Sequence, residues 1–488
     1  SCDFKVNKNI MSTKEVAIFL QQPNRRLQLE FKDSLESIQV IETEIPKQLR
    51  QGGIPIGYAT YKGEKILTSW NIKDRHIAPM HKVITGLQRT GKSSYIKNFA
   101  IEAIKQGHSV ILIDTIKNCE VANDVRDYMP EEFKDKIIVL DYGDLDYLLP
   151  LAWNEVKIDP KSRLREKMKI SSMLAGNFEY FLDTVVDARN KDDLLSPRMK
   201  KYLSSACKLV LSQENTTIKD VLDCLTNVTD RHRFIESSGL STNSSTVMEL
   251  LRLDETDKQG NIRTKYSEIS GIIDRASILF NDYVMEMLLS TPPNPDIDFV
   301  KWTNEGKCIL ITMSELDFSR TTLKALVTFM YSKIWLSMLM RGNNNDKPRI
   351  THVILDEIHN FPQVTEMLKL NCREAAKFGL SYVFTSHLLK DLKGLLPYIK
   401  GSGANFMLFK TTKENFKLME EEIKLGGFEL EDCLKIKDYH TLNIVNYDRD
   451  YVVYISKVID MVEKRFKKFN RSYIDDICKK KYGRIVDF

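Results

Sequence analysis

The sequence lacks the features that mark several protein classes. Its eight cysteines are scattered, and no two lie within four residues of each other, so no zinc-binding or redox spacing is present. Such cysteines are typical of free, mostly buried thiols in a reducing compartment. There is no internal repeat and no long uncharged apolar run, because the most apolar stretch, Leu323–Met340, contains Lys324 and Lys333. This stretch predicts a buried helix rather than a membrane span.

The sequence also has little net charge and no recognisable secretory signal peptide. The formal net charge is +5 although 28% of the residues are charged. The charge is uneven, because residues 456–488 contain ten Lys or Arg and five Asp or Glu, an excess equal to that of the whole chain. A basic end suits a polyanionic partner, and an ordinary solvated face is the alternative. The first residue is not Met, which leaves open an upstream segment such as a membrane anchor.

The sequence does contain two blocks in which apolar runs alternate with helical periodicity. Fully apolar strands of this kind predict a parallel sheet with helices on both faces, the α/β fold class. The predicted strands of the first block are Lys82–Thr85, Val110–Ile113 and Ile137–Leu140. Those of the second block are Cys308–Met313, His352–Leu355, Tyr382–Thr385 and Asn405–Phe409.

Between these blocks, from about residue 159 to 290, the periodicity is helical with almost no strand signal. The predicted helices are Arg163–Leu174, Arg198–Leu211 and Ile269–Leu289, and the polar stretch Ser237–Gly260 is expected to be a mobile loop. Short β-like runs with turn signals lie in residues 35–80. We therefore expect a small β-rich N-terminal unit (1–80), the first part of a nucleotide-binding domain (81–155), an inserted all-helical domain (156–300), the second part of the nucleotide-binding domain (301–455) and a basic C-terminal tail (456–488).

The most specific motif lies between a predicted strand and a predicted helix. Residues 86–93 read Gly-Leu-Gln-Arg-Thr-Gly-Lys-Ser, which matches the Walker A pattern of a P-loop. The glycines let consecutive N–H groups point at phosphate oxygens, and the helix that follows adds its positive N-terminal end. Lys92 is expected to reach the β- and γ-phosphates, and Ser93 to hold Mg²⁺. The predicted nucleotide-binding residues are Gly86, Leu87, Gln88, Arg89, Thr90, Gly91, Lys92, Ser93 and Ser94.

Two acids follow the predicted strand His352–Leu355. Asp356 is expected to complete the Mg²⁺ site with Ser93, and Glu357 to polarise the attacking water. The alternative is a strand followed by two solvated acids. Asp114 also follows a strand, but it lies close to the P-loop in sequence, so we expect a structural or nucleotide-facing role. These motifs together predict an ATPase with ATP and Mg²⁺ as cofactors.

The segments around these acids resemble a known family. Asp356-Glu-Ile-His-Asn-Phe and the later run from Arg373 to His387 (Arg-Glu-Ala-Ala-Lys-Phe-Gly-Leu-Ser-Tyr-Val-Phe-Thr-Ser-His) are similar to the HerA–FtsK superfamily of DNA-pumping motors. The similarity is greatest to the type IV secretion coupling proteins of conjugation. It covers about residues 54–458, and the order of elements is more specific than the Walker motifs alone. It implies a RecA-like P-loop ATPase core and a homo-oligomeric, hexameric ring through which DNA passes.

Three positions depart from the family pattern. His387 stands where a Gln usually senses the γ-phosphate, Ala376 where an arginine finger is usual, and Lys410 where Arg often follows Phe. His387 can still donate a hydrogen bond to a phosphate or water, with added sensitivity to pH. Arg373 lies one helical turn before Ala376 on a similar face, so we expect it to supply the finger. An ordinary surface arginine is the alternative.

Weaker finger candidates are Arg320 and Arg341, and His359 is more typical of a residue behind the site or in the core. Two basic segments are candidate DNA contacts, Lys390–Lys400 and Arg163–Lys169, although solvated loops are the alternative for both. Neither segment interleaves aromatic and basic residues strongly, so contacts would be to phosphates and independent of sequence. Neither single- nor double-stranded DNA is favoured.

These patterns together predict a cytoplasmic, ATP-dependent DNA translocase of the coupling-protein type. The expected catalytic residues are Glu357, Lys92, His387 and Arg373. Attachment to the inner face of a membrane, through a partner in a secretion or transfer complex, is left open. Alternatives are a secretion-system assembly or protein-translocating ATPase, a phage or HerA-type DNA-processing motor, and a nucleotide-binding scaffold without motor activity. The intact Glu357 disfavours the last.

Overall fold

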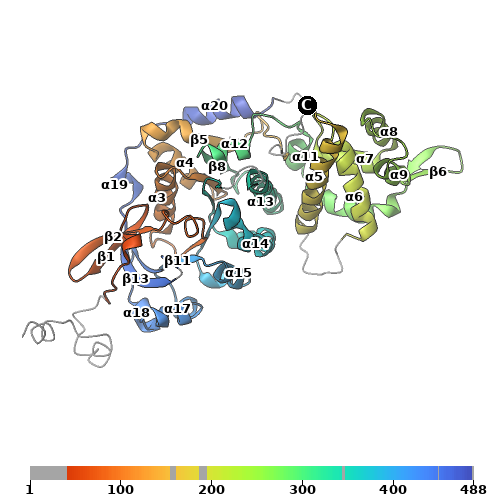
Figure 1. Ribbon diagram of the computed structural model, residues 1–488. Helices are drawn as coiled ribbons and strands as arrows, with labels where there is room; N and C mark the ends of the chain where they lie inside the picture. Colours follow the sequence, from red (N-terminus) through yellow and green to blue (C-terminus); the bar gives the residue numbers. More distant parts are fainter. Residues whose placement is uncertain (1–40, 154–160, 186–194, 343–346, 449, 486–488) are drawn as a thin grey trace, which may run out of the picture.

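The computed structural model describes residues 41–153, 161–185, 195–342, 347–448 and 450–485, so the first half of the expected β-rich unit, residues 1–40, lies outside the described residues. Its centre is an 11-stranded sheet in the order β2-β1-β13-β12-β11-β3-β10-β9-β4-β8-β5 (Figure 1). The strands are β1 (Ile54–Tyr61), β2 (Glu64–Trp70), β3 (Lys82–Thr85), β4 (Ser109–Asp114), β5 (Ile137–Asp141), β8 (Cys308–Thr312), β9 (Thr351–Leu355), β10 (Leu380–Ser386), β11 (Asn405–Phe409), β12 (His440–Asn446) and β13 (Tyr451–Val458).

The strands from β11 to β5 run parallel, and those from β12 to β2 are antiparallel. Every residue of β3, β4, β8, β9, β10 and β11 is buried, which explains why their sequences are mostly apolar and do not alternate with exposed polar residues. This arrangement confirms the α/β fold expected from the sequence.

The strand order determines which helices cover which face. The connections β3–β4 and β4–β5, through α3 (Lys92–Lys105) and α4 (Glu120–Tyr128), move along the sheet in one direction. The connections β8–β9 and β9–β10, through α13 (Arg320–Gly342) and α14 (Pro362–Ala375), move in the opposite direction. Because crossovers are right-handed, the two helix pairs lie on opposite faces, and each buries the sheet from its own side (Figure 1).

Both ends of the described chain join this sheet. The β1–β2 hairpin pairs with the outer edge of β13, so the strands expected in a separate N-terminal unit extend the main sheet and cover an otherwise open edge. At the other end, residues 456–458 complete β13, and α20 (Ser472–Tyr482) packs on β5. Arg471 is buried and donates hydrogen bonds to the carbonyls of Arg126 and Met129. Residues 456–485 are therefore folded onto the core, although their composition predicts a basic tail.

The helical insert lies between β5 and β8. Its helices are α5 (Leu164–Val185), α6 (Pro197–Val210), α7 (Ile218–Thr226), α8 (Val228–Ser237), α9 (Ser245–Leu251), α10 (Ser270–Phe280), α11 (Tyr283–Ser290) and α12 (Phe299–Asn304). The expected single helix Ile269–Leu289 is divided into α10 and α11, because Asp282 caps α11 by accepting a hydrogen bond from the Met285 N–H at 3.0 Å.

The stretch Ser237–Gly260 is not the mobile loop that its composition predicts. It contains α9 and the strand β6 (Asp254–Thr256), which pairs with β7 (Ile262–Thr264). Val247 and Leu250 of α9 are fully buried, and α9 packs against α6. The prediction was wrong because the polar residues are exposed or form caps and turns, while a few apolar side chains anchor the segment.

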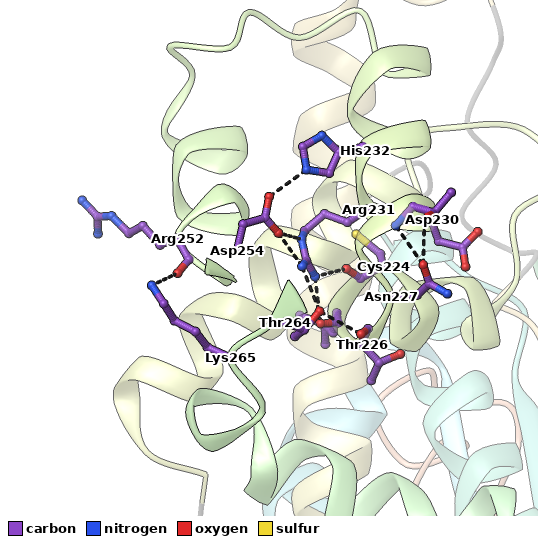
Figure 2. A network of polar contacts seen from close by, with 12 residues as sticks. Cys224, Thr226, Asn227, Asp230, Arg231, His232, Arg252, Asp254, Thr264 and Lys265 are labelled. Carbon is purple, nitrogen blue, oxygen red and sulfur yellow. Dashed lines mark hydrogen bonds and ion pairs between the residues drawn. The ribbon is translucent and has the colours of Figure 1, made fainter. Parts of the chain in front are cut away.

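A buried arginine fastens this hairpin to the helices (Figure 2). The Arg231 side chain is 0% exposed, and its guanidinium donates to Asp254 Oδ1 at 2.9 and 2.6 Å and to Thr264 Oγ1 at 3.0 Å. It also donates to the carbonyls of Cys224 and Leu225 at the end of α7. A single side chain therefore joins α7, α8, β6 and β7.

Replacement of Arg231 by methionine should destabilise the protein by about 3–5 kcal/mol, because it leaves the carboxylate of Asp254 largely buried without its main partner. Arg233→Met is the matched control, since Arg233 lies on the same helix, is exposed, and contacts only near neighbours in sequence among the described residues, Asp230 one turn away and the Phe234 ring. That variant should change stability by no more than about 0.5 kcal/mol. Urea unfolding of both variants tests the assignment, which equal losses would contradict.

Among the described residues, one helix is long and apolar enough to cross a membrane by length and composition alone. It is α13, in which an 18-residue window within residues 320–341 has a mean hydropathy of 1.2 and is 78% buried. Lys333 is buried and donates to the Ala152 carbonyl at 2.7 Å, and Trp335 and Phe378 make an edge-on ring contact. The helix predicted at Leu323–Met340 is thus a core helix of this fold.

Candidate functional site

The P-loop joins β3 to α3 at the carboxyl edge of the parallel strands. Gly91 has φ +110°, a left-handed conformation, and immediately precedes α3. A Cβ atom on Gly91 would lie 2.9 Å from the Tyr439 ring, and one on Gly86 would lie 2.9 Å from Thr90 Oγ1, so neither position has room for a side chain. Thr90 Oγ1 donates to the Leu87 carbonyl at 2.7 Å and closes the loop on itself. The local sequence therefore produces the phosphate-cradle geometry.

A pocket of about 370 Å³ opens over this loop, a volume within the range of small-molecule sites. Seven of the nine predicted nucleotide-binding residues line it, together with residues from three other segments. The lining residues are Leu87, Gln88, Arg89, Gly91, Lys92, Ser93, Ser94, His387, Tyr439 and Met461. The structure thus brings the predicted sensor residue His387 to the P-loop.

The two predicted acids lie directly beneath the P-loop lysine. Lys92 Nζ forms an ion pair with Glu357 Oε1 and lies 3.5 Å from Asp356 Oδ1. All three side chains are at most 10% exposed, so the contact is partly shielded from solvent. The alternative of two solvated acids is therefore inconsistent with the structure. As long as no ligand competes for Lys92, the Lys92 ammonium group stays paired with the carboxylate of Glu357, the group expected to act on water.

The local fold fixes the orientation of both acids. Asp356 Oδ1 accepts a hydrogen bond from Thr385 Oγ1 at 2.8 Å, across the β9–β10 pair, and one from the Glu357 N–H at 3.1 Å. Glu357 has φ +54°, which is unfavourable for a residue other than glycine. Such strain is often retained at functional positions because the surrounding structure enforces it. Here it turns the Glu357 carboxylate away from the strand and toward Lys92.

Two imidazoles flank Glu357. His387 Nε2 lies 3.4 Å from Glu357 Oε1, and His359 Nδ1 lies 3.3 Å from Glu357 Oε2. From the sequence, His359 is expected behind the site or in the core, but the structure places it beside the predicted catalytic carboxylate with its side chain 28% exposed. The only feature of the sequence that could have indicated this placement is the position of His359 two residues after Glu357.

Ser93 and Asp356 suit Mg²⁺ only in combination with a nucleotide. Among the described residues, no group of three or more His, Cys, Asp or Glu side chains could hold a metal ion. Mg²⁺ needs about six oxygen ligands and commonly takes several of them from phosphates and water. The hydroxyl of Ser93 in the first turn of α3 and the carboxylate of Asp356 fit that mode.

Asp114 has a structural role in this arrangement. Its carboxylate accepts hydrogen bonds from the N–H groups of Ile116 at 3.1 Å and Ala122 at 3.0 Å, and thereby holds the connection from β4 into α4. Burial raises the pKa of Asp114 above its usual value. Of the two roles left open by the sequence, these contacts favour the structural one.

The structure distinguishes the three finger candidates. Arg341 is 0% exposed and donates to Thr351 Oγ1 at 2.7 Å and to the Phe378 carbonyl at 2.6 Å, so it cannot reach another subunit. Burial lowers the pKa of Arg341 to about 10. Arg373 is exposed near the end of α14 and lies over the Tyr398 ring, 5.6 Å from its centroid. Arg320, the first residue of α13, is also exposed.

Tyr439 and Met461 line the pocket but were missed in the sequence analysis. Tyr439 precedes β12 and Met461 follows β13, so both are far from the P-loop in sequence. No local motif marks them, and only the strand order of the sheet brings them to the loop.

A parallel sheet with a P-loop at its carboxyl edge, and with two acids after β9, two strands along from the P-loop strand β3, defines a P-loop nucleotide-binding fold. No family model and no curated protein sequence matches the chain. Among solved structures, the unbound conjugative coupling protein TrwB is similar with a TM-score of 0.51 and 13% identity, covering 85% of this chain and 91% of that one. TrwB in complex with the GTP analogue GDPNP is similar with a TM-score of 0.51 and 13% identity, covering 85% of this chain and 92% of that one. TrwB in complex with ADP and Mg²⁺ is similar with a TM-score of 0.50 and 13% identity, covering 85% of this chain and 91% of that one.

The chain thus has the fold of a conjugative coupling protein, which confirms the fold implied by the sequence resemblance. At 13% identity the similarity shows the fold alone. The chain's own site must therefore carry any argument about function.

Proposed function

We propose that this chain is a Mg²⁺-dependent ATPase that moves DNA, in the manner of a conjugative coupling protein. The observation that carries the proposal is the placement of Lys92 against Asp356 and Glu357 beneath the P-loop. The TrwB structures that contain nucleotide, one of them with Mg²⁺, support the same ligands here. We further propose that the protein acts in the cytoplasm as a homo-oligomeric ring. Partner proteins would attach this ring to a membrane complex.

The contacts suggest how this chain's residues would act. Phosphate oxygens would replace the Glu357 carboxylate as the partner of Lys92, which would free Glu357 to orient and polarise the attacking water. Ser93 and Asp356 would hold Mg²⁺, which supplies charge stabilisation at the phosphates. His387 lies 3.4 Å from Glu357 and lines the pocket, so it could donate a hydrogen bond to the γ-phosphate or to the water.

The start of α5 is the better of the two candidate DNA contacts. Residues 163–169 carry Arg163, Arg165, Lys167 and Lys169 against the single acid Glu166, and all but Lys167 of these cations are exposed. Within the described part of the chain, none of the four forms an ion pair. Cations at the positive end of a helix are unfavourable unless an anion compensates them. In the other segment, Lys400 is already paired with Glu422 at 2.8 Å.

The proposal predicts that DNA stimulates ATP hydrolysis, and that binding weakens steeply with salt and ignores sequence. Arg165→Gln/Lys169→Gln should lower the salt slope of DNA binding by about 1–2, since each phosphate contact contributes about 1, and should leave hydrolysis without DNA unchanged. Lys258→Gln, an exposed change elsewhere in the insert, should leave the slope unchanged. Turnover should be measured with single- and double-stranded DNA. Hydrolysis unaffected by either would favour a protein-translocating ATPase.

A further inference from the structure

The strand order places different residues at the two ends of the proposed nucleotide pocket. The acids and His387 follow β9 and β10, which lie on one side of the P-loop strand β3. Tyr439 precedes β12 and Met461 follows β13, and both strands lie on the other side of β3. If the terminal phosphate faces Glu357 and His387, the opposite end of the ligand faces Tyr439 and Met461. For a nucleoside triphosphate, that opposite end carries the base.

Tyr439 is held against the P-loop by backbone contacts. Its N–H donates to the Thr90 carbonyl at 3.1 Å, and its carbonyl accepts from the Val458 N–H at 2.9 Å. It has φ +59°, an unfavourable conformation for an aromatic residue. The ring packs so close to Gly91 that a Cβ on that glycine would lie 2.9 Å from it. This strained backbone places an aromatic ring at the mouth of the pocket rather than in the core.

The exposed surface at this end of the pocket is apolar. Tyr439 is 41% exposed, Met461 37% and Leu87 37%, and all three line the pocket. These exposures are high for large apolar side chains next to a buried site, and no other part of the described protein covers them. An aromatic face and a thioether are groups on which a flat heteroaromatic ring stacks well.

We infer that Tyr439 and Met461 form the surface on which the purine base of the bound nucleotide stacks, a role that rests on the nucleotide binding proposed above. The contact uses the face of the base and not its hydrogen-bonding edge. It therefore adds affinity without distinguishing adenine from guanine, because every base has a π-face. Tyr439 is a binding residue in this scheme and has no part in the chemistry.

Calorimetric titration with ATP, GTP and inorganic tripolyphosphate tests the inference. Tyr439→Ala should weaken ATP and GTP by the same factor, about fivefold to 150-fold from the range known for base–aromatic stacking, and leave tripolyphosphate unchanged. Tyr439→Phe should bind all three ligands like the wild type. Met461→Ala should show a smaller loss, confined to the nucleotides. Alanine, like tyrosine, has a Cβ and disfavours positive φ, so the variant does not remove the backbone strain as glycine would.

Different failures point to different errors. Equal losses for ATP and tripolyphosphate would overturn the stacking role and assign Tyr439 to shaping the P-loop. Unchanged nucleotide affinity in both Tyr439→Ala and Met461→Ala would place the base elsewhere. A wild-type protein that binds tripolyphosphate and ATP equally would refute base stacking while leaving the phosphate site intact. A wild-type protein that binds neither would refute the proposed function itself.

Discussion

Replacing Glu357 by glutamine should give a protein that binds ATP more tightly than the wild type and hydrolyses it at least about a hundredfold more slowly. The slow step follows from loss of the carboxylate that acts on water, since a positioned general base typically contributes about 10²–10⁴ in rate. The tighter binding follows from the ion pair between Lys92 and Glu357, which ATP must break. Glutamine keeps the size of the side chain but removes the charge that competes with phosphate.

The comparison with Lys92→Ala sharpens this result. That variant breaks the same ion pair but should lose ATP binding and hydrolysis together, while the loop keeps its shape through Gly86, Gly91 and the Thr90–Leu87 hydrogen bond. Opposite effects on affinity would show that the pair is a competitor of the nucleotide. Glu374→Gln, an exposed change on α14, is the neutral control. Near-normal turnover of Glu357→Gln would show that another group acts on the water.

The nucleotide end of this site was predictable because its signals are local. The Walker A segment, the apolar strands and the acids after β9 are each contained within a few residues, and parallel strands place their carboxyl ends at one edge. A strand that is buried on both faces is largely apolar, so its sequence is easily recognised. The pairing of Lys92 with Glu357 then follows from β9 lying one strand away from β3, across β10.

Other features depend on contacts that no local pattern encodes. Arg231 is a charged residue in a polar segment, and only its distant partners Asp254 and Thr264 make it a buried anchor. In the sequence Arg471 resembles part of a basic tail, but in the structure it donates hydrogen bonds to backbone carbonyls at the end of α4. Tyr439 adopts a backbone conformation that its residue type disfavours. In each case tertiary structure overrides the local preference, so composition alone pointed to loops, tails or solvent.

The arginine finger is the part of the proposed machine that a single chain cannot complete. Arg341 is excluded by burial, and within the described residues Arg373 has no contact with Lys92, Glu357 or His387. An exposed arginine outside its own site can act only on the site of a neighbouring subunit. We therefore expect turnover per subunit to rise with protein concentration as rings form, with DNA promoting the effect.

Arg373→Ala should then leave ATP affinity nearly unchanged and lower turnover at least about a hundredfold, a conservative part of the 10³–10⁵ range for fingers supplied in trans. That range corresponds to about 4–7 kcal/mol at the barrier. Arg320→Ala is both the matched control and the test of the other exposed candidate, since only the true finger should show the loss. Mixed assemblies of Arg373→Ala and Lys92→Ala subunits should regain part of the activity, because each subunit retains the group that the other lacks. A monomer with full, concentration-independent activity would refute the finger, and with it the ring, because a residue that works across an interface cannot contribute where no interface exists.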